Sequence, residues 1–210
     1  MRVMFIIAAA LTCGCQTTAP GHYGYDIADH YPLDGSVLVW EYNNEESSDH
    51  LTVEKIGSES LDEREVITLT HTLTNEEGEQ TWVADVRWAS DPVVGVLLYG
   101  YAQGETVVDL EPPVILANRH GVPGDVATTY SNGQGWISTF ERIEGCATFW
   151  VPQWVDESCL VLTLDDGDDD PATNGIVTGT YHLVPRYGAA WLELDAYGVQ
   201  WRLADHTWEE

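Results

Sequence analysis

Four cysteines are the residues in this sequence with the most distinctive chemistry, and they form two pairs. Cys13 and Cys15 follow the apolar run VMFIIAAAL near the N-terminus, and Cys146 and Cys159 lie far along the chain. A C-x-C pair with no second pair nearby lacks the four-ligand set of a structural zinc site. We therefore expect no metal at Cys13 and Cys15, and interpret them as part of a processing signal.

The N-terminal run is too short to cross a bilayer, which takes about 20 residues, and it follows Arg2 as in a secretory signal peptide. The sequence LTCGC resembles the lipobox of bacterial lipoproteins, with Gly14 fitting and Thr12 standing where leucine is usual. This predicts a signal peptide over residues 1–14 and lipidation of Cys15; the alternative is soluble export. Several acyl chains on one residue anchor durably. Since Gln16 follows Cys15, the resemblance favours the outer membrane or cell surface.

The second pair of cysteines is expected to form a disulfide, because export leads to an oxidising compartment. Twelve residues separate Cys146 from Cys159. Closing a loop of this length stabilises a fold by about 3 kcal/mol in the chain-entropy model. Two buried free thiols are the alternative.

An acidic run, LDDGDDDPATNG, contains the strongest candidates for a metal site. Calcium prefers clustered carboxylate and carbonyl oxygens, which Asp166, Asp168, Asp170 and Asn174 offer. The run fails the EF-hand template, because Pro171 stands where that loop needs glycine. We favour a solvated loop over an ordered calcium site and expect no other cofactor.

Other candidate functional side chains are scattered. Trp150 and Trp154 bracket VPQ in a loop-like stretch, where aromatic rings bind sugars or partners, and His120 lies on a Gly-Pro loop. His71 and His182 share strand faces with apolar residues and are expected in the core. The sequence has neither H-E-x-x-H nor G-x-S-x-G spacing, so it assigns no catalytic residue and leans away from an enzyme.

Charge limits the partners. The chain has 35 Asp and Glu against 8 Lys and Arg, a formal net charge of −27. Such a field repels phosphate backbones and anionic lipid headgroups, which excludes nucleic acid as a partner. Because 44% of the residues are hydrophobic, the chain is nevertheless expected to fold.

Short segments rich in β-branched and aromatic residues recur after a polar tether at 15–29. Ten of them are predicted as strands, at 36–42, 65–73, 80–88, 93–101, 105–110, 135–143, 159–164, 176–184, 189–195 and 199–205. The best helical window, EESSDHLTVEKI, is weakly periodic. A single open sheet of so many strands, each with one apolar face, would leave its edges exposed, so the sheet is expected to close into a barrel or to pack against a second sheet. We predict one all-β domain over residues 30–210, an antiparallel barrel, half-barrel or sandwich.

The segment HYPLDGSVLVWEY resembles an N-terminal motif of exported bacterial lipoproteins, aromatic-Pro-Leu, Gly and Trp-x-Tyr. The C-terminal segment GTYHLVPRYGAAWLELDAYGVQWRL is similar to the closing strands of that family, whose domains resemble the curved sheets of lipoprotein-localisation proteins. The resemblance implies an envelope protein and allows lipid carriage. We expect a non-enzymatic, lipid-anchored protein that binds either an unidentified partner (a protein, glycan or lipid) or an apolar ligand. The alternative is an exported carbohydrate-binding or hydrolytic domain using loop carboxylates and exposed Trp.

Overall fold

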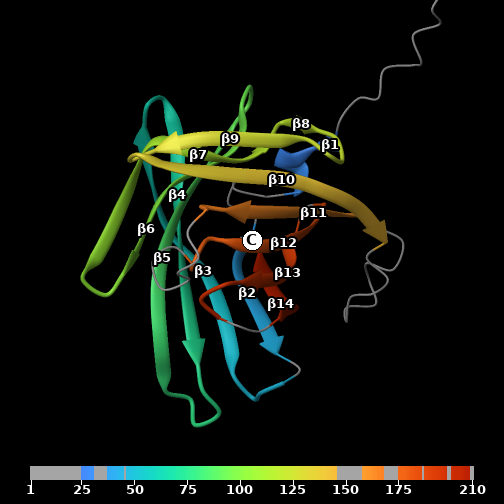
Figure 1. Cartoon of the computed structure of the whole chain (residues 1–210). Helices are drawn as coiled ribbons and strands as arrows, with labels where there is room; N and C mark the ends of the chain where they lie inside the picture. The colour runs from blue at the N-terminus through green and yellow to red at the C-terminus, as the bar shows by residue number, and fades with distance from the viewer. Residues whose placement is uncertain are drawn as a thin grey trace, which may run out of the picture.

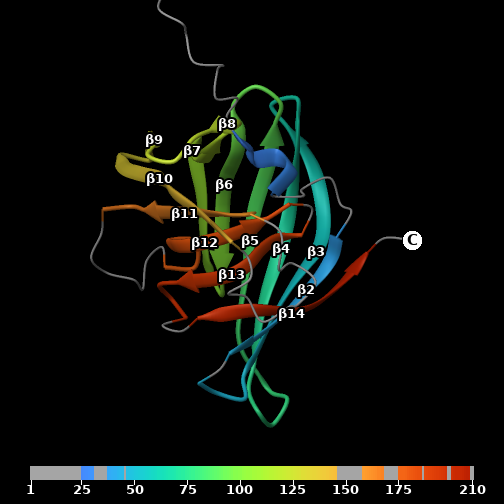
Figure 2. The same ribbon diagram turned by 90° about the vertical axis from the view of Figure 1, so that its right-hand side faces the viewer.

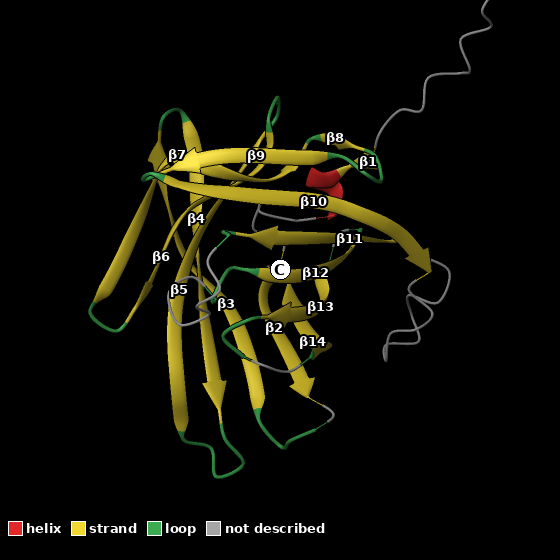
Figure 3. Cartoon of the chain, viewed as in Figure 1, coloured by secondary structure: helices red, strands yellow, loops and turns green. Residues whose placement is uncertain are grey.

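The computed structural model describes residues 25–30, 37–44, 46–145, 158–167, 175–185, 187–197 and 200–208. Its elements are, in chain order, β1 (Tyr25–Asp26), the 3-10 helix η1 (Ile27–His30), β2 (Val37–Asn44), β3 (His50–Leu61), β4 (Arg64–Thr74), β5 (Gln80–Asp91), β6 (Gly95–Gln103), β7 (Thr106–Asn118), β8 (His120–Gly121), β9 (Val126–Ser131), β10 (Gln134–Gly145), β11 (Ser158–Asp165), β12 (Gly179–Val184), β13 (Gly188–Leu194) and β14 (Trp201–Trp208). The described part is therefore all-β apart from one helical turn, as predicted (Figure 3).

Twelve strands form one antiparallel sheet in the order β7-β6-β5-β4-β3-β2-β14-β13-β12-β11-β10-β9. Strands that are neighbours in this sheet follow one another along the chain, with one exception. Strand β2, near the N-terminus, pairs with β14, near the C-terminus. The sheet curves until β7 and β9, its two edges, lie side by side (Figures 1 and 2). Of the predicted architectures, the barrel-like one is therefore confirmed.

Side-chain and main-chain hydrogen bonds complete the closure where the regular strand pairing stops. The Ile115 amide donates to Thr129 Oγ1 at 3.2 Å, the Asn132 amide donates to the Glu111 carbonyl at 3.3 Å, and Ser138 Oγ donates to the Leu116 carbonyl. Pro112 and Pro113 lie on the β7 side of this seam and have no N–H to offer a ladder. The barrel is thus nearly closed, with no long open edge between β7 and β9.

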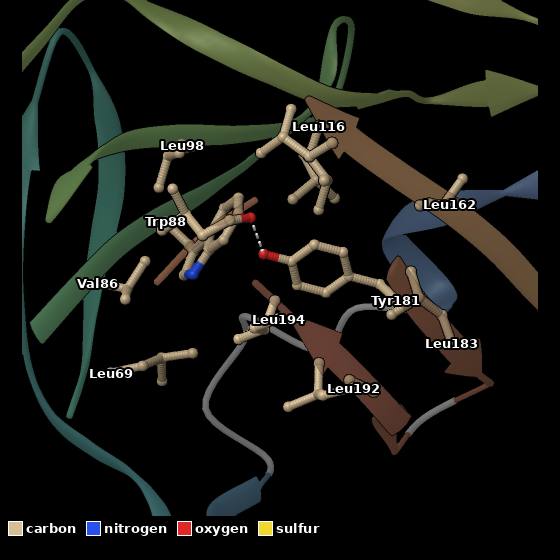
Figure 4. Close-up of a cluster of buried hydrophobic side chains, with 14 of the residues drawn as sticks. Leu69, Val86, Trp88, Leu98, Leu116, Leu162, Tyr181, Leu183, Leu192 and Leu194 are labelled. Atoms are coloured by element: carbon tan, nitrogen blue, oxygen red, sulfur yellow. Dashed lines mark hydrogen bonds between the residues drawn. The ribbon is translucent and has the colours of Figure 1, made fainter. Parts of the chain in front are cut away.

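Large apolar side chains fill the interior of the barrel (Figure 4). Trp88, Trp136 and Trp201 are each only 1% exposed, and Leu162 is fully buried. Tyr181 also points inward, and its hydroxyl donates to the Val177 carbonyl. The alternation of apolar and polar residues along each strand produces this one-sided core.

A small cluster of polar side chains lies at the β5–β6 turn. Asp91 accepts hydrogen bonds from the amides of Val93 at 2.7 Å and Val94 at 2.8 Å, and it pairs with Arg64. Arg64 also donates to the Tyr99 hydroxyl at 3.2 Å. This arrangement lowers the pKa of Asp91 to about 2, through the Val94 amide first and Arg64 second.

The first described residues belong to the folded part of the chain, although the sequence assigns residues 25–29 to the tether. Tyr25 and Asp26 pair with Gly121 and His120, and Ile27 is fully buried in the core. Both views place β1 and β8 at one end of the barrel and the turns β2–β3 and β4–β5 at the opposite end (Figures 1 and 2).

Candidate functional site

The acidic run enters the described structure only at its start. Asp166 follows β11 and is 6% exposed, while Asp168, Asp170 and Asn174 lie outside the described residues. Burial, with the charge of Asp166 second, raises the pKa of Tyr101 to about 12. Within the described ranges, no three His, Cys, Asp or Glu side chains are grouped to hold a metal ion. Calcium binding therefore stays a prediction.

Most of the other predicted site residues also fall outside the described ranges: Cys15, Cys146, Trp150 and Trp154. Cys159 is described and fully buried on β11. Gly145, which precedes Cys146 in the chain, pairs with Ser158, which precedes Cys159. The disulfide therefore stays a prediction, because Cys146 lies outside the described residues.

Hydrogen bonds of neighbouring residues fix the loop around His120. Arg119 donates to the Asp26 carboxylate at 2.9 Å and to the Pro92 carbonyl at 2.8 Å. Asp125 accepts from the Val122 amide at 2.9 Å. These contacts hold β1 and the loop against the barrel, and His120 itself is exposed on β8. The described contacts of Arg119 and Asp125 are therefore structural.

The two histidines expected in the core are both buried. His71 lies inside the barrel, with Nδ1 3.0 Å from the Tyr197 hydroxyl, and burial lowers its pKa to about 4. His182 lies on the outer face of β12, with Nδ1 3.0 Å from Glu144 Oε1. Burial lowers the pKa of His182, and Glu144 partly opposes the shift.

From His182, a row of polar and aromatic side chains runs across the outer face of five strands. Strand register places His182 opposite Trp191, Trp191 opposite Arg202, Arg202 opposite Asn43, and Asn43 opposite His50. Side chains opposite one another on a sheet face lie about 5 Å apart. The row therefore brings together residues that are distant in sequence, from β12, β13, β14, β2 and β3.

The rings and charges in this row contact one another. His182 stacks on Trp191 with ring centroids 4.4 Å apart and planes 14° apart. The Arg202 guanidinium carbon lies 5.0 Å from the centre of the Trp191 ring, a cation–π distance. His50 Nδ1 lies 2.8 Å from Asn43 Oδ1. These contacts orient Arg202 and Asn43 on the surface.

The far end of the row opens into a groove of about 450 Å³ beside the β2–β3 turn. We call it the Arg202 groove. It is lined by Asn43, Asn44, Ser47, Ser48, Asp49, His50 and Arg202. Its volume lies within the range of about 300 to 1,000 Å³ that is usual for small-ligand sites. The Arg202 groove is the candidate functional site of the described structure.

Sequence reasoning did not find this groove. Its residues come from positions 43–50 and 202, and only the pairing of β2 with β14 brings them together. The available signal was that Asn43 and Arg202 each fall on the polar side of an alternating strand, and this does not indicate a pocket.

In the described ranges, no helix combines the length and apolar character that a membrane crossing requires. No family model matches this sequence, and neither a curated protein nor a solved structure matches it significantly.

Proposed function

We propose that this chain is a lipid-anchored protein of the cell envelope whose all-β domain is a non-catalytic binding module acting through its outer surface. The observation that carries the proposal is the filled interior. The inner pocket beside Trp40, Trp88 and Tyr181 has a volume of only about 30 Å³. That is room for about one water molecule, whereas a small ligand needs about 300 Å³ or more. Of the two ligand types expected, a partner on the surface is therefore favoured over an apolar ligand carried inside.

The position of β1 supports the anchoring part of the proposal. The chain enters the barrel at Tyr25, ten residues after Cys15 and at the end opposite the β2–β3 turn (Figure 1). An extended tether of that length spans at most about 35 Å. Lipid on Cys15 would thus hold the domain close to the membrane with the Arg202 groove facing away. The net charge of −27 keeps the domain itself off an anionic bilayer.

Detergent phase separation tests the proposal. The wild-type protein, made in a bacterial host with lipoprotein processing, is expected in the detergent phase, and the Cys15→Ser variant in the aqueous phase. Cys13→Ser is the matched control, because Cys13 is removed with the signal peptide and its loss leaves partitioning unchanged. Equal partitioning of wild type and Cys15→Ser would contradict the anchor.

The disulfide belongs to the same proposal, since export leads to an oxidising compartment. Cys159 is fully buried, and the pairing of Gly145 with Ser158 brings the end of β10 to the start of β11. Alkylation under denaturing, non-reducing conditions should label neither Cys146 nor Cys159. Two labelled thiols would rule the bridge out.

Calcium remains the only cofactor that we propose for testing. A site at Asp166, Asp168, Asp170 and Asn174 would raise the melting temperature as calcium is added. A melting temperature unchanged by millimolar calcium would remove the site. The alternative function, a carbohydrate-binding or hydrolytic domain built on loop carboxylates with Trp150 and Trp154, involves side chains outside the described residues.

A further inference from the structure

The Arg202 groove offers both hydrogen-bond donors and acceptors within a small area. Asn43 and Asn44 supply amides, Ser48 a hydroxyl, Asp49 a carboxylate and Arg202 a guanidinium. Amide, carboxylate and guanidinium groups are planar forks that present two hydrogen-bonding atoms side by side. Neighbouring hydroxyls of a sugar ring match such a fork, because each hydroxyl both donates and accepts.

The groove is formed before any ligand arrives. Asn44 Oδ1 accepts the Glu46 amide at 2.7 Å, and Ser47 Oγ accepts the Asp49 amide at 3.2 Å, which fix the turn. Asn43 is oriented by His50, and Arg202 by the Trp191 ring. A site whose side chains are already ordered loses little conformational entropy when it binds.

Charge and lining select the class of ligand. Every described side chain that lines the Arg202 groove carries a polar group, while most of the surface exposed inside the groove belongs to carbon atoms. A ligand with both hydroxyl groups and C–H faces therefore matches it better than a wholly apolar ligand, which would leave the polar groups unsatisfied. An anionic ligand would approach against a net charge of −27. A cationic ligand would be attracted by that net charge and by Asp49, but it would meet the Arg202 guanidinium inside the groove. A neutral molecule rich in hydroxyl groups satisfies the lining and avoids both repulsions.

We propose that the Arg202 groove binds a neutral saccharide, as a short stretch of a glycan chain. This inference rests on the proposed function of a surface-binding envelope module and names its site and ligand class. It uses Asn43, Asp49 and Arg202 rather than Trp150 and Trp154, and no sugar ring needs to stack on Trp191, which His182 and Arg202 already contact.

Binding to an array of immobilised oligosaccharides tests the inference with the purified full-length chain. The array holds neutral oligomers of glucose, mannose, galactose, xylose and N-acetylglucosamine, and acidic oligomers of uronic acids. We expect binding to at least one neutral series and none to the acidic series. Binding to the acidic series alone, or to no oligosaccharide, would overturn the inference.

Two variants and a matched control locate the site. Arg202→Gln removes the guanidinium, and Ser48→Tyr fills the groove from an exposed turn residue. Each should weaken binding at least tenfold. Lys55→Gln, which removes one positive charge from β3 at a position outside the groove lining, should bind as wild type does. Wild-type binding by Ser48→Tyr would contradict the site. Detergent phase separation of the same preparations reports on the anchor separately, so failure of one does not imply failure of the other.

Discussion

Replacing His71 tests how completely the interior of the barrel excludes water. Burial lowers the pKa of His71 from its ordinary 6.5 to about 4. Between these pH values the unfolded chain binds a proton that the folded chain excludes. The free energy of unfolding therefore falls as the pH drops below 6.5, until the loss is complete below pH 4.

The size of this effect follows from the shift in pKa. A difference of about 2.5 pKa units corresponds to about 3.4 kcal/mol at most, and to about 2 kcal/mol between pH 7 and pH 5. In His71→Gln, the amide oxygen can still accept from the Tyr197 hydroxyl, but the proton-binding site is gone. Its free energy of unfolding should thus lose about 2 kcal/mol less than that of wild type over this interval.

Urea unfolding at pH 7 and pH 5 measures the difference, with the midpoint multiplied by the slope at each pH. His120→Gln is the control, since it removes an exposed histidine and should keep the wild-type pH dependence. Carboxylates titrate alike in all three proteins and cancel in the comparison. If His71→Gln shows the same pH dependence as wild type, His71 is hydrated in the folded state and the packed interior is refuted.

Three other substitutions, with Val93→Ala as a control, probe the packing and backbone of the barrel by urea unfolding. Leu162→Ala should lower the free energy of unfolding by about 3 kcal/mol, because it leaves a cavity at a fully buried position. Val93→Ala, at an 83% exposed position, should change it by less than about 0.5 kcal/mol. Equal effects of the two substitutions would contradict the assigned core. Asp91→Ala should lower the free energy of unfolding by about 3 kcal/mol, because Arg64 and two amides lose their acceptor. In the wild-type protein, the stability that ionised Asp91 contributes should be lost as the pH falls from about 3.8 through about 2. An unchanged free energy of unfolding for Asp91→Ala at pH 7 would refute this stabilising role. Gly179→Ala should cost more than about 1 kcal/mol, because its φ is +131° and a Cβ would lie 2.1 Å from the Glu193 carbonyl oxygen; unchanged stability would show that this backbone is not strained.

The sequence predicts the strands best where one face is buried. The segments 65–73, 80–88 and 159–164 alternate or are continuously apolar, and each lies within a strand of the structure. By contrast, EESSDHLTVEKI, the best helical window, contains the start of β3. Residues 56–60 of β3 are exposed on both faces, so the strand extends beyond the core and its polar half has no alternation to read. β9 is short and Thr-rich, and it was also not predicted.

Register is the property that the sequence could not provide, and the candidate site depends on it. Arg202 lies beside Asn43 only because β14 pairs with β2, more than 150 residues away in the chain. Hydrophobic alternation specifies which face a residue takes, and both residues do lie on the polar side of their strands. It does not specify which strands are neighbours, because that choice follows from closure of the whole sheet.

We propose that lipid on Cys15 holds this domain at the envelope and that the domain binds through its surface. Intact mass spectrometry of the protein purified from the membrane fraction tests the anchor most directly. The expected wild-type chain begins at Cys15 and carries the added mass of two or three acyl chains, whereas Cys15→Ser carries none. A wild-type protein that retains residues 1–14, or that begins after them without added acyl mass, would contradict lipid anchoring at Cys15.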